Sequence, residues 1–113
     1  MGYRSRVLLG TAVLSLATPV FAANVGHSAH LIRINSLGDG RVVLQFDVDN
    51  SACLDTNSPK GYYLAVGQNG ITADGLKNIL ATAMLTYSQG KMLSFYFDSS
   101  TAYCYVGQVT LVD

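Results

Sequence analysis

Few side chains in this sequence have the types and spacing from which an active site is built. His27 and His30 are spaced H-x-x-H, an arrangement that presents two metal ligands when it lies on a helix. Here the pair comes before or at a strand, so we interpret both histidines as ordinary solvent-exposed residues. Asp47 and Asp49 begin like a calcium-binding loop, but the glycine and the closing acidic residue of such a loop are absent. We therefore predict no metal site.

The sequence also lacks the groups that enzymes use for proton transfer and covalent catalysis. It contains no Glu, no G-x-S-x-G motif and no nucleophile beside a base. We therefore predict no catalytic residues, no cofactor, and a function in binding rather than in catalysis.

Tyrosine is the residue type best suited to binding. All seven tyrosines except Tyr3 lie beyond residue 22. Neighbours such as Tyr62 and Tyr63 point to opposite faces of a strand, so at least one of them faces outward. An outward Tyr offers a flat apolar ring and a hydroxyl, which suits sugars and protein interfaces; ordinary β-sheet composition explains the tyrosines equally well. We select Tyr62, Tyr63 and Asn35 as candidate ligand contacts.

The first 22 residues have the pattern of a secretory signal peptide. Arg4 and Arg6 precede an apolar run at 7–20, and Ala22 ends a cleavage-type motif. The run is short for a membrane anchor, and no later segment is apolar enough to span a bilayer. We therefore predict a signal peptide at 1–22, a single domain at 23–113, no membrane span, and secretion or a periplasmic location.

The cysteine and charge content fit that location. Cys53 and Cys104 are most simply one disulfide in an oxidising compartment, although free thiols or a metal pair are alternatives. Without Arg4 and Arg6, five basic residues remain beside seven acidic ones, a net charge of −2. No basic run is present, which argues against nucleic acid as a partner.

One long segment, 72–90, has a helical period. Thr72 or Asp74 would cap its start and Gly90 would end it. The apolar stripe that we expect to be buried comprises Leu76, Ile79, Leu80, Ala83, Met84 and Tyr87.

The opposite side of this helix carries Leu85 among small residues. A single exposed Leu is common in soluble proteins, but small neighbours allow a second helix to approach. Together with the fold, this predicts a homo-oligomer in which the helices meet, with Asn78, Ala81 and Leu85 in the interface.

The remaining segments read as strands. Residues 23–28 read as a loose terminus, and Gly107 indicates a bend or bulge. The expected strands alternate apolar and polar residues at 29–36, 41–49, 61–66, 91–97 and 103–112. Val48 and Val66 are expected on the buried faces of the second and third strands. The order β-β-β-α-β-β predicts a mainly β fold, a five-stranded OB-fold-like small barrel, with an open antiparallel sheet as the alternative.

The run ADGLKNILATAMLTYSQGKMLSFYF at 73–97 resembles the helix and following strand of the B subunits of bacterial A–B toxins, the subtilase cytotoxin and pertussis-like group. In that family, as in Ser88-Gln89-Gly90-Lys91, a glycine ends the helix before an alternating strand. The resemblance implies an OB-fold, a ring pentamer and binding of cell-surface glycans, often sialylated. No family contact residue maps onto this chain, and any partner catalytic subunit is unknown.

These observations favour a secreted or periplasmic, non-enzymatic binding module, an oligomeric subunit that recognises a glycan or glycoprotein receptor. The alternative is a periplasmic protein–protein interaction module, such as an inhibitor, an immunity factor or an envelope accessory protein, that acts as a monomer or dimer.

Overall fold

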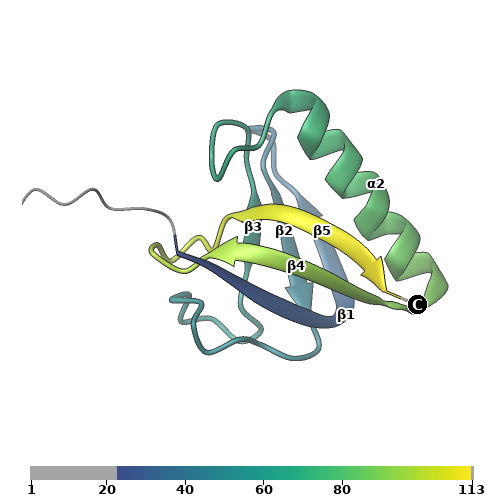
Figure 1. Cartoon of the computed structure of the whole chain (residues 1–113), viewed down its shortest axis with the longest axis horizontal. Coiled ribbons are helices and arrows are strands. Elements are labelled where there is room, and N and C mark those ends of the chain that lie inside the picture. The colour runs from purple at the N-terminus through teal and green to yellow at the C-terminus, as the bar shows by residue number, and fades with distance from the viewer. Residues whose placement is uncertain (1–22, 113) are drawn as a thin grey trace, which may run out of the picture.

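The structure, a computed structural model, describes residues 23–112 (Figure 1). The predicted signal peptide at 1–22 lies outside the described residues. The elements are β1 (Asn24–Ser36), β2 (Val42–Phe46), β3 (Tyr62–Leu64), α2 (Ala73–Gln89), β4 (Met92–Asp98) and β5 (Val106–Val112). This confirms the predicted order β-β-β-α-β-β. None of the helices in the described part of the chain has the length and apolar character to cross a membrane.

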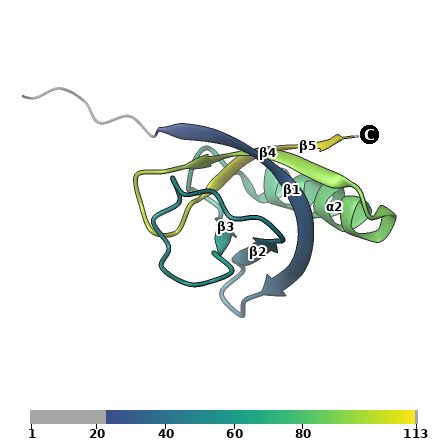
Figure 2. The ribbon, with the colours of Figure 1, turned by 90° about the horizontal axis from the view of Figure 1, so that it is seen from below.

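The five strands form one antiparallel sheet in the order β3-β2-β1-β4-β5. β1 is its long central strand and arches around the molecule (Figure 2). Its first half pairs with β4, from Asn24 to His30. From Leu31 its second half pairs with β2, and a bulge between Leu31 and Arg33, just after this change of partner, bends the strand.

The bend brings the two edge strands toward each other. The backbone N–H of Tyr63 on β3 donates to the carbonyl of Tyr103, just before β5, at 3.1 Å. No continuous ladder joins β3 to β5 in residues 23–112, so the sheet is not closed. The fold is therefore the predicted OB-fold-like small barrel, in its partly open form.

The core comes from alternate residues of the strands. Leu93, Phe95 and Phe97 of β4 are all buried, as the alternation predicts. Phe95 stacks on Phe46 of β2 with ring centroids 4.6 Å apart, and Phe97 meets Tyr62 of β3 edge to face at 5.2 Å. Aromatic contacts thus join three strands across the barrel interior.

Strand lengths differ from the sequence-based expectations. Residues 23–28, expected to be loose, belong mainly to β1, because Asn24–His30 pair with β4. β2 ends at Phe46 and β3 at Leu64, so Val48 and Val66, expected to face the core, are exposed. In both cases hydrogen-bonded pairing ends before the apolar alternation does.

α2 has the predicted caps. The Thr72 hydroxyl accepts a hydrogen bond from the Gly75 N–H at 3.0 Å. Gly90 adopts a left-handed φ of 64°, and its N–H bonds to the carbonyls of Thr86 and Tyr87. The helix packs against β1, β4 and β5 (Figure 1).

The buried stripe of α2 is rotated from the predicted one. Ile79, Ala83 and Thr86 are buried, with Leu76 and Leu80 packed beside them. Thr86 is accommodated because its hydroxyl donates to the carbonyl of Thr82 at 2.7 Å. Ala83 and Thr86 thus take the places against the sheet, so the expectation that Met84 and Tyr87 are buried is wrong; both are exposed.

Candidate functional site

Tyr62 is a core residue. Its side chain is 0% exposed, and its hydroxyl accepts a hydrogen bond from the Asn50 N–H at 2.9 Å. The prediction that Tyr62 contacts a ligand is therefore wrong. Its inward position follows from the alternation of β3, which buries Tyr62 and Leu64 and turns Tyr63 outward.

Tyr63 is the centre of an outward aromatic cluster. The Tyr103 ring meets it edge to face with centroids 5.2 Å apart, and the Tyr105 ring lies at 6.4 Å. Tyr103 and Tyr105 stack on each other at 5.4 Å. We call Tyr63, Tyr103 and Tyr105 the tyrosine platform.

Arg41 borders the tyrosine platform. Its guanidinium carbon lies 5.3 Å from the centre of the Tyr63 ring, within the range of a cation–π contact. Asp39 accepts hydrogen bonds from the Arg41 backbone N–H at 3.1 Å and from Nε at 2.7 Å. The backbone hydrogen bond, with help from the side-chain bond and the charge of Arg41, holds the pKa of Asp39 below its ordinary value. The acidic partner fixes Arg41 and offsets its charge.

The platform lies on the face of the barrel formed by β2, β3 and two loops. In an OB-fold, the face of strands 2 and 3, together with the loops between strands 1 and 2 and between strands 4 and 5, binds oligonucleotides and oligosaccharides. Tyr63 comes from β3, Arg41 from the loop after β1, and Tyr103 and Tyr105 from the loop after β4. A depression of about 300 Å³ lies beside the platform, lined by Asp39, Gly40, Arg41, Ala65, Val66, Gln68 and Tyr105.

Asn35 is exposed on the same face. It pairs with Val43 on β2, which in turn pairs with Tyr63 on β3, so the three side chains form one row across the sheet. Two strand spacings, about 10 Å, separate Asn35 from Tyr63. The structure therefore places two of the three candidate ligand contacts, Asn35 and Tyr63, on one face.

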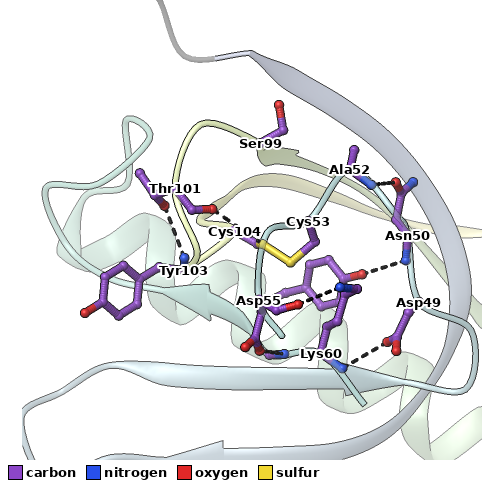
Figure 3. The surroundings of a disulfide bond; sticks show 12 residues. Asp49, Asn50, Ala52, Cys53, Asp55, Lys60, Ser99, Thr101, Tyr103 and Cys104 are labelled. Atoms are coloured by element: carbon purple, nitrogen blue, oxygen red, sulfur yellow. Dashed lines mark hydrogen bonds between the residues drawn. A yellow bond between two sulfur atoms is a disulfide. The ribbon is translucent and has the colours of Figure 1, made fainter. Parts of the chain in front are cut away.

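The predicted disulfide between Cys53 and Cys104 is confirmed, with Cα atoms 5.6 Å apart. Cys104 is buried between the two outward tyrosines of the loop, and Figure 3 shows Tyr103 pointing away from the disulfide. The backbone of Cys104 has a left-handed φ of 46°, which is unfavourable for a residue with a side chain. The disulfide therefore anchors the loop that carries Tyr103 and Tyr105.

The other end of the disulfide lies in the connection between β2 and β3. Asp55 Oδ2 accepts from the Gly61 N–H at 2.7 Å, and Asp55 Oδ1 accepts from the Asn57 N–H at 3.1 Å. Burial acts to raise the pKa of Asp55, but these hydrogen bonds and the charge of Lys60 outweigh it, so the pKa lies below its ordinary value. Asp49 Oδ1 likewise accepts a hydrogen bond from a backbone N–H of this connection, that of Lys60, at 3.0 Å (Figure 3).

The two histidines tie β1 to the start of that connection. His27 Nε2 lies 2.8 Å from the Val48 carbonyl, and its ring meets Phe95 edge to face at 5.6 Å. His27 is thus half-buried against the core, so the interpretation of both histidines as solvent-exposed is wrong for His27. His30 is exposed and pairs with Asp47 at 3.2 Å. No group of three or more acidic, His or Cys residues suited to a metal ion occurs within 23–112.

The predicted interface residues of α2 all lie on its exposed side. Asn78, Ala81 and Leu85 face away from the sheet, and Met84 joins them. The homo-oligomer stays a prediction.

No protein-family model matches this chain, and no curated protein matches its sequence. The resemblance to toxin B subunits is therefore still a prediction. Of the residues that form this candidate face, the sequence analysis selected Tyr63 and Asn35 but not Arg41, Tyr103 or Tyr105, and a role of any of them in ligand binding stays a prediction. The signal that pointed to the last two was their position on either side of Cys104, on a loop that borders the ligand-binding face of an OB-fold.

Proposed function

We propose that this protein is a non-enzymatic binding module that recognises a glycan through the tyrosine platform. The observation that carries the proposal is the convergence of Tyr63, Tyr103 and Tyr105 on one outward face of an OB-fold-like barrel. Clustered tyrosine rings supply flat apolar surfaces with hydroxyls at their edges, which matches the alternation of C–H faces and hydroxyls on a sugar. The platform needs no catalytic group to serve this role.

A saccharide fits this face better than a nucleic acid does. A nucleic-acid site requires clustered cations that neutralise phosphates. Arg41 is bound to Asp39, and Arg33 Nη1 donates to Gln45 Oε1 at 2.8 Å. Both arginines of this face are thus held by side chains of the protein itself, and its charge is too small for a polyanion.

A glycan array probed with the oxidised protein, expressed from its full sequence, tests the proposal. We expect binding to a subset of glycans, lost in a Tyr103→Ala variant because a wall of the platform is removed. Val48→Ala is the control, since Val48 is also exposed but lies beyond the end of β2, outside the platform and outside α2, and it should bind normally. A folded wild-type protein that binds no glycan on the array contradicts the proposal.

The proposed location is outside the cytoplasm, secreted or periplasmic. Support comes from the Cys53–Cys104 disulfide, which is typical of oxidising compartments, and from the signal-like pattern of residues 1–22. We expect mass spectrometry of the exported protein to show a mature chain that begins at residue 23.

A second candidate function, an interaction module for another protein, is favoured by α2. Its outer side exposes Met84, Leu85 and Tyr87, each with about half of its surface in contact with solvent. Contiguous apolar side chains of this kind are common at protein interfaces. A homo-oligomer, a pentamer if the toxin resemblance holds, would use this side for self-association. A monomer that binds an envelope protein through it would support the second function instead.

A further inference from the structure

A second outward face is built by the first half of β1 together with β4 and β5. In this sheet Ser28 pairs with Ser94, which pairs with Thr110, so three hydroxyl side chains form a row. The next row along the strands contains Gly26, Tyr96 and Gln108. These rows carry hydroxyl, amide and phenol groups and no ionised side chain.

Tyr96 is the aromatic centre of this second face and is 50% exposed. A Cβ atom on Gly26 would lie 3.3 Å from Cε1 of Tyr96, so the ring extends over the glycine on β1. The missing side chain therefore lets the ring lie along the sheet, while half of the residue's surface stays accessible.

A pocket of about 190 Å³ adjoins Tyr96 and is lined by Asn24, Asn69, Gly107 and Gln108. Asn69 Nδ2 donates to Asn24 Oδ1 and to the Tyr105 carbonyl, both at 2.9 Å. These bonds fix the orientation of both amides, because the Tyr105 carbonyl can only accept. Two side-chain atoms of these amides, the acceptor Asn69 Oδ1 and the donor Asn24 Nδ2, have no hydrogen-bond partner within residues 23–112.

Gly107 makes room for this arrangement. It is the extra residue of a bulge, since Tyr96 pairs with Gln108 while Phe97 pairs with Val106. A Cβ atom at Gly107 would lie 2.8 Å from Asn69 Nδ2. Asn69 itself has a left-handed φ of 51°. The bulge and the missing side chain therefore bring the Asn69 amide to the edge of β5 and leave the pocket open.

We propose that this pocket is a second carbohydrate site, specific for an uncharged sugar ring stacked on Tyr96. Sites for drug-sized ligands have volumes of about 300–1,000 Å³, so a pocket this small suits one ring of a saccharide. Its open amide groups match sugar hydroxyls, which both donate and accept hydrogen bonds. No charged side chain lines the pocket, which favours a neutral sugar over an acidic one. The inference goes beyond the proposed function, because no platform side chain takes part.

The test is an NMR titration of the ¹⁵N-labelled, oxidised protein with methyl glycosides of glucose, galactose, mannose and N-acetylglucosamine. We expect at least one neutral glycoside to shift the backbone amide signals of Tyr96, Gly107 and Gln108. Methyl glucuronoside is the charged comparison, and it should shift them less. In Tyr96→Ala these shifts should be lost, whereas Val48→Ala, which shortens a similarly exposed apolar side chain outside every proposed site, should keep them.

Three results would overturn this inference: no neutral glycoside shifts these signals, the shifts survive in Tyr96→Ala, or methyl glucuronoside alone produces them. Tyr103→Ala separates the two proposals, because it should abolish platform binding and leave the Tyr96 titration unchanged. Should Tyr96→Ala fail to fold, Gln108→Ala, an exposed change in the same pocket, gives the same readout through a loss of affinity.

Discussion

Tyr62 and Tyr63 are neighbours in the chain, yet the first belongs to the core and the second to the tyrosine platform. The alternation of β3 separates them, and the hydrogen bond from the Asn50 N–H satisfies the buried hydroxyl of Tyr62. Burial raises the pKa of Tyr62, with Asp49 and Asp55 adding to the shift. The phenol therefore contributes stability that is present below its ordinary pKa of 10.0 and is lost as the pH rises above it.

We predict that Tyr62→Phe destabilises the protein without changing ligand binding. The variant leaves the Asn50 N–H without its acceptor, a loss that costs about 1–3 kcal/mol when the group stays buried. Urea unfolding measures the difference in the free energy of unfolding. Tyr87→Phe on the exposed side of α2 should change it by less than about 0.5 kcal/mol. Equal stability of Tyr62→Phe and the wild type would show that water replaces the lost partner.

Asp55 makes the stability of the domain sensitive to acid. Its pKa is lowered on folding, so its contribution is present above the ordinary value of 3.8 and is lost as the pH falls through the folded-state pKa. We expect Asp55→Asn to flatten the fall in unfolding free energy below about pH 5. Asn57→Ala, which removes only the side-chain donor of the pair, should have a smaller effect. If the stability of Asp55→Asn falls with acid as steeply as that of the wild type, Asp55 is not the source of the acid sensitivity.

Residue-level reasoning from the sequence could assign neighbouring tyrosines to opposite faces but could not choose which one faces outward. That choice depends on which face of β3 meets Phe46, Phe95 and Phe97, and these contacts are made by residues distant in sequence. The same limit concealed Tyr103 and Tyr105, because their proximity to Tyr63 exists only once the barrel has formed.

At the scale of elements, α2 illustrates how a helix can be predicted well and oriented imperfectly. Its caps, Thr72 and Gly90, are local and could be read from residue types. Its orientation depends on the tertiary fit, which prefers the small residues Ala83 and Thr86 against the sheet over the larger Met84 and Tyr87. Hydrophobicity alone therefore misassigned the edge of the stripe.

The rotated stripe leads to a direct comparison of two large residues on α2. Ile79→Ala should destabilise the protein by about 2–5 kcal/mol, because Ile79 is buried against the core. Met84→Ala should change the stability by less than about 0.5 kcal/mol, because Met84 is 55% exposed. Thermal or urea unfolding of both variants measures these changes. Equal losses of stability would indicate that Met84 is buried, as the sequence analysis expected.

Strand prediction was accurate where alternation and pairing coincide. For β4, the alternation correctly predicted that Leu93, Phe95 and Phe97 face the core. The bend or bulge expected at Gly107 is present as a bulge. The first half of β1 was missed because its inward residues are only Val25, His27 and Ala29, too weak an apolar pattern to identify a strand. Its extended form depends on pairing with β4, a partner far along the chain.

At the scale of the whole molecule, the disulfide joins the two connections on either side of the barrel opening. The cysteines are separated by 51 residues, for which the chain-entropy model gives about 4 kcal/mol of stabilisation. We predict that a Cys53→Ser, Cys104→Ser double variant loses stability of this order and binds glycans more weakly, since Tyr103 and Tyr105 lose their anchor. Calorimetry and array binding, compared with the oxidised wild type, measure both effects. If the double variant folds and binds glycans as well as the wild type, the disulfide is not needed to position Tyr103 and Tyr105.

The proposed assembly can be tested at the same scale. If copies associate through α2, Leu85→Asp should reduce the native mass to that of a monomer, because a buried carboxylate at an apolar interface is costly. Leu85 is about half exposed, so the monomer itself should stay folded. Val48→Asp provides a charge-matched control at a similarly exposed apolar residue outside α2. A wild-type protein that is already monomeric by light scattering rules the assembly out.

β1 is shared between the two halves of the sheet, and this sets the order in which the chain can fold. β1, β2 and β3 follow one another in sequence and can associate as a local meander. The first half of β1 has to wait for β4, since Asn24 pairs with Asp98. Closing so long a loop is slow, and until then β1 presents an unpaired edge that can recruit other chains. A chain emerging from a ribosome or a translocation pore is thus most vulnerable to aggregation just before residues 92–98 appear.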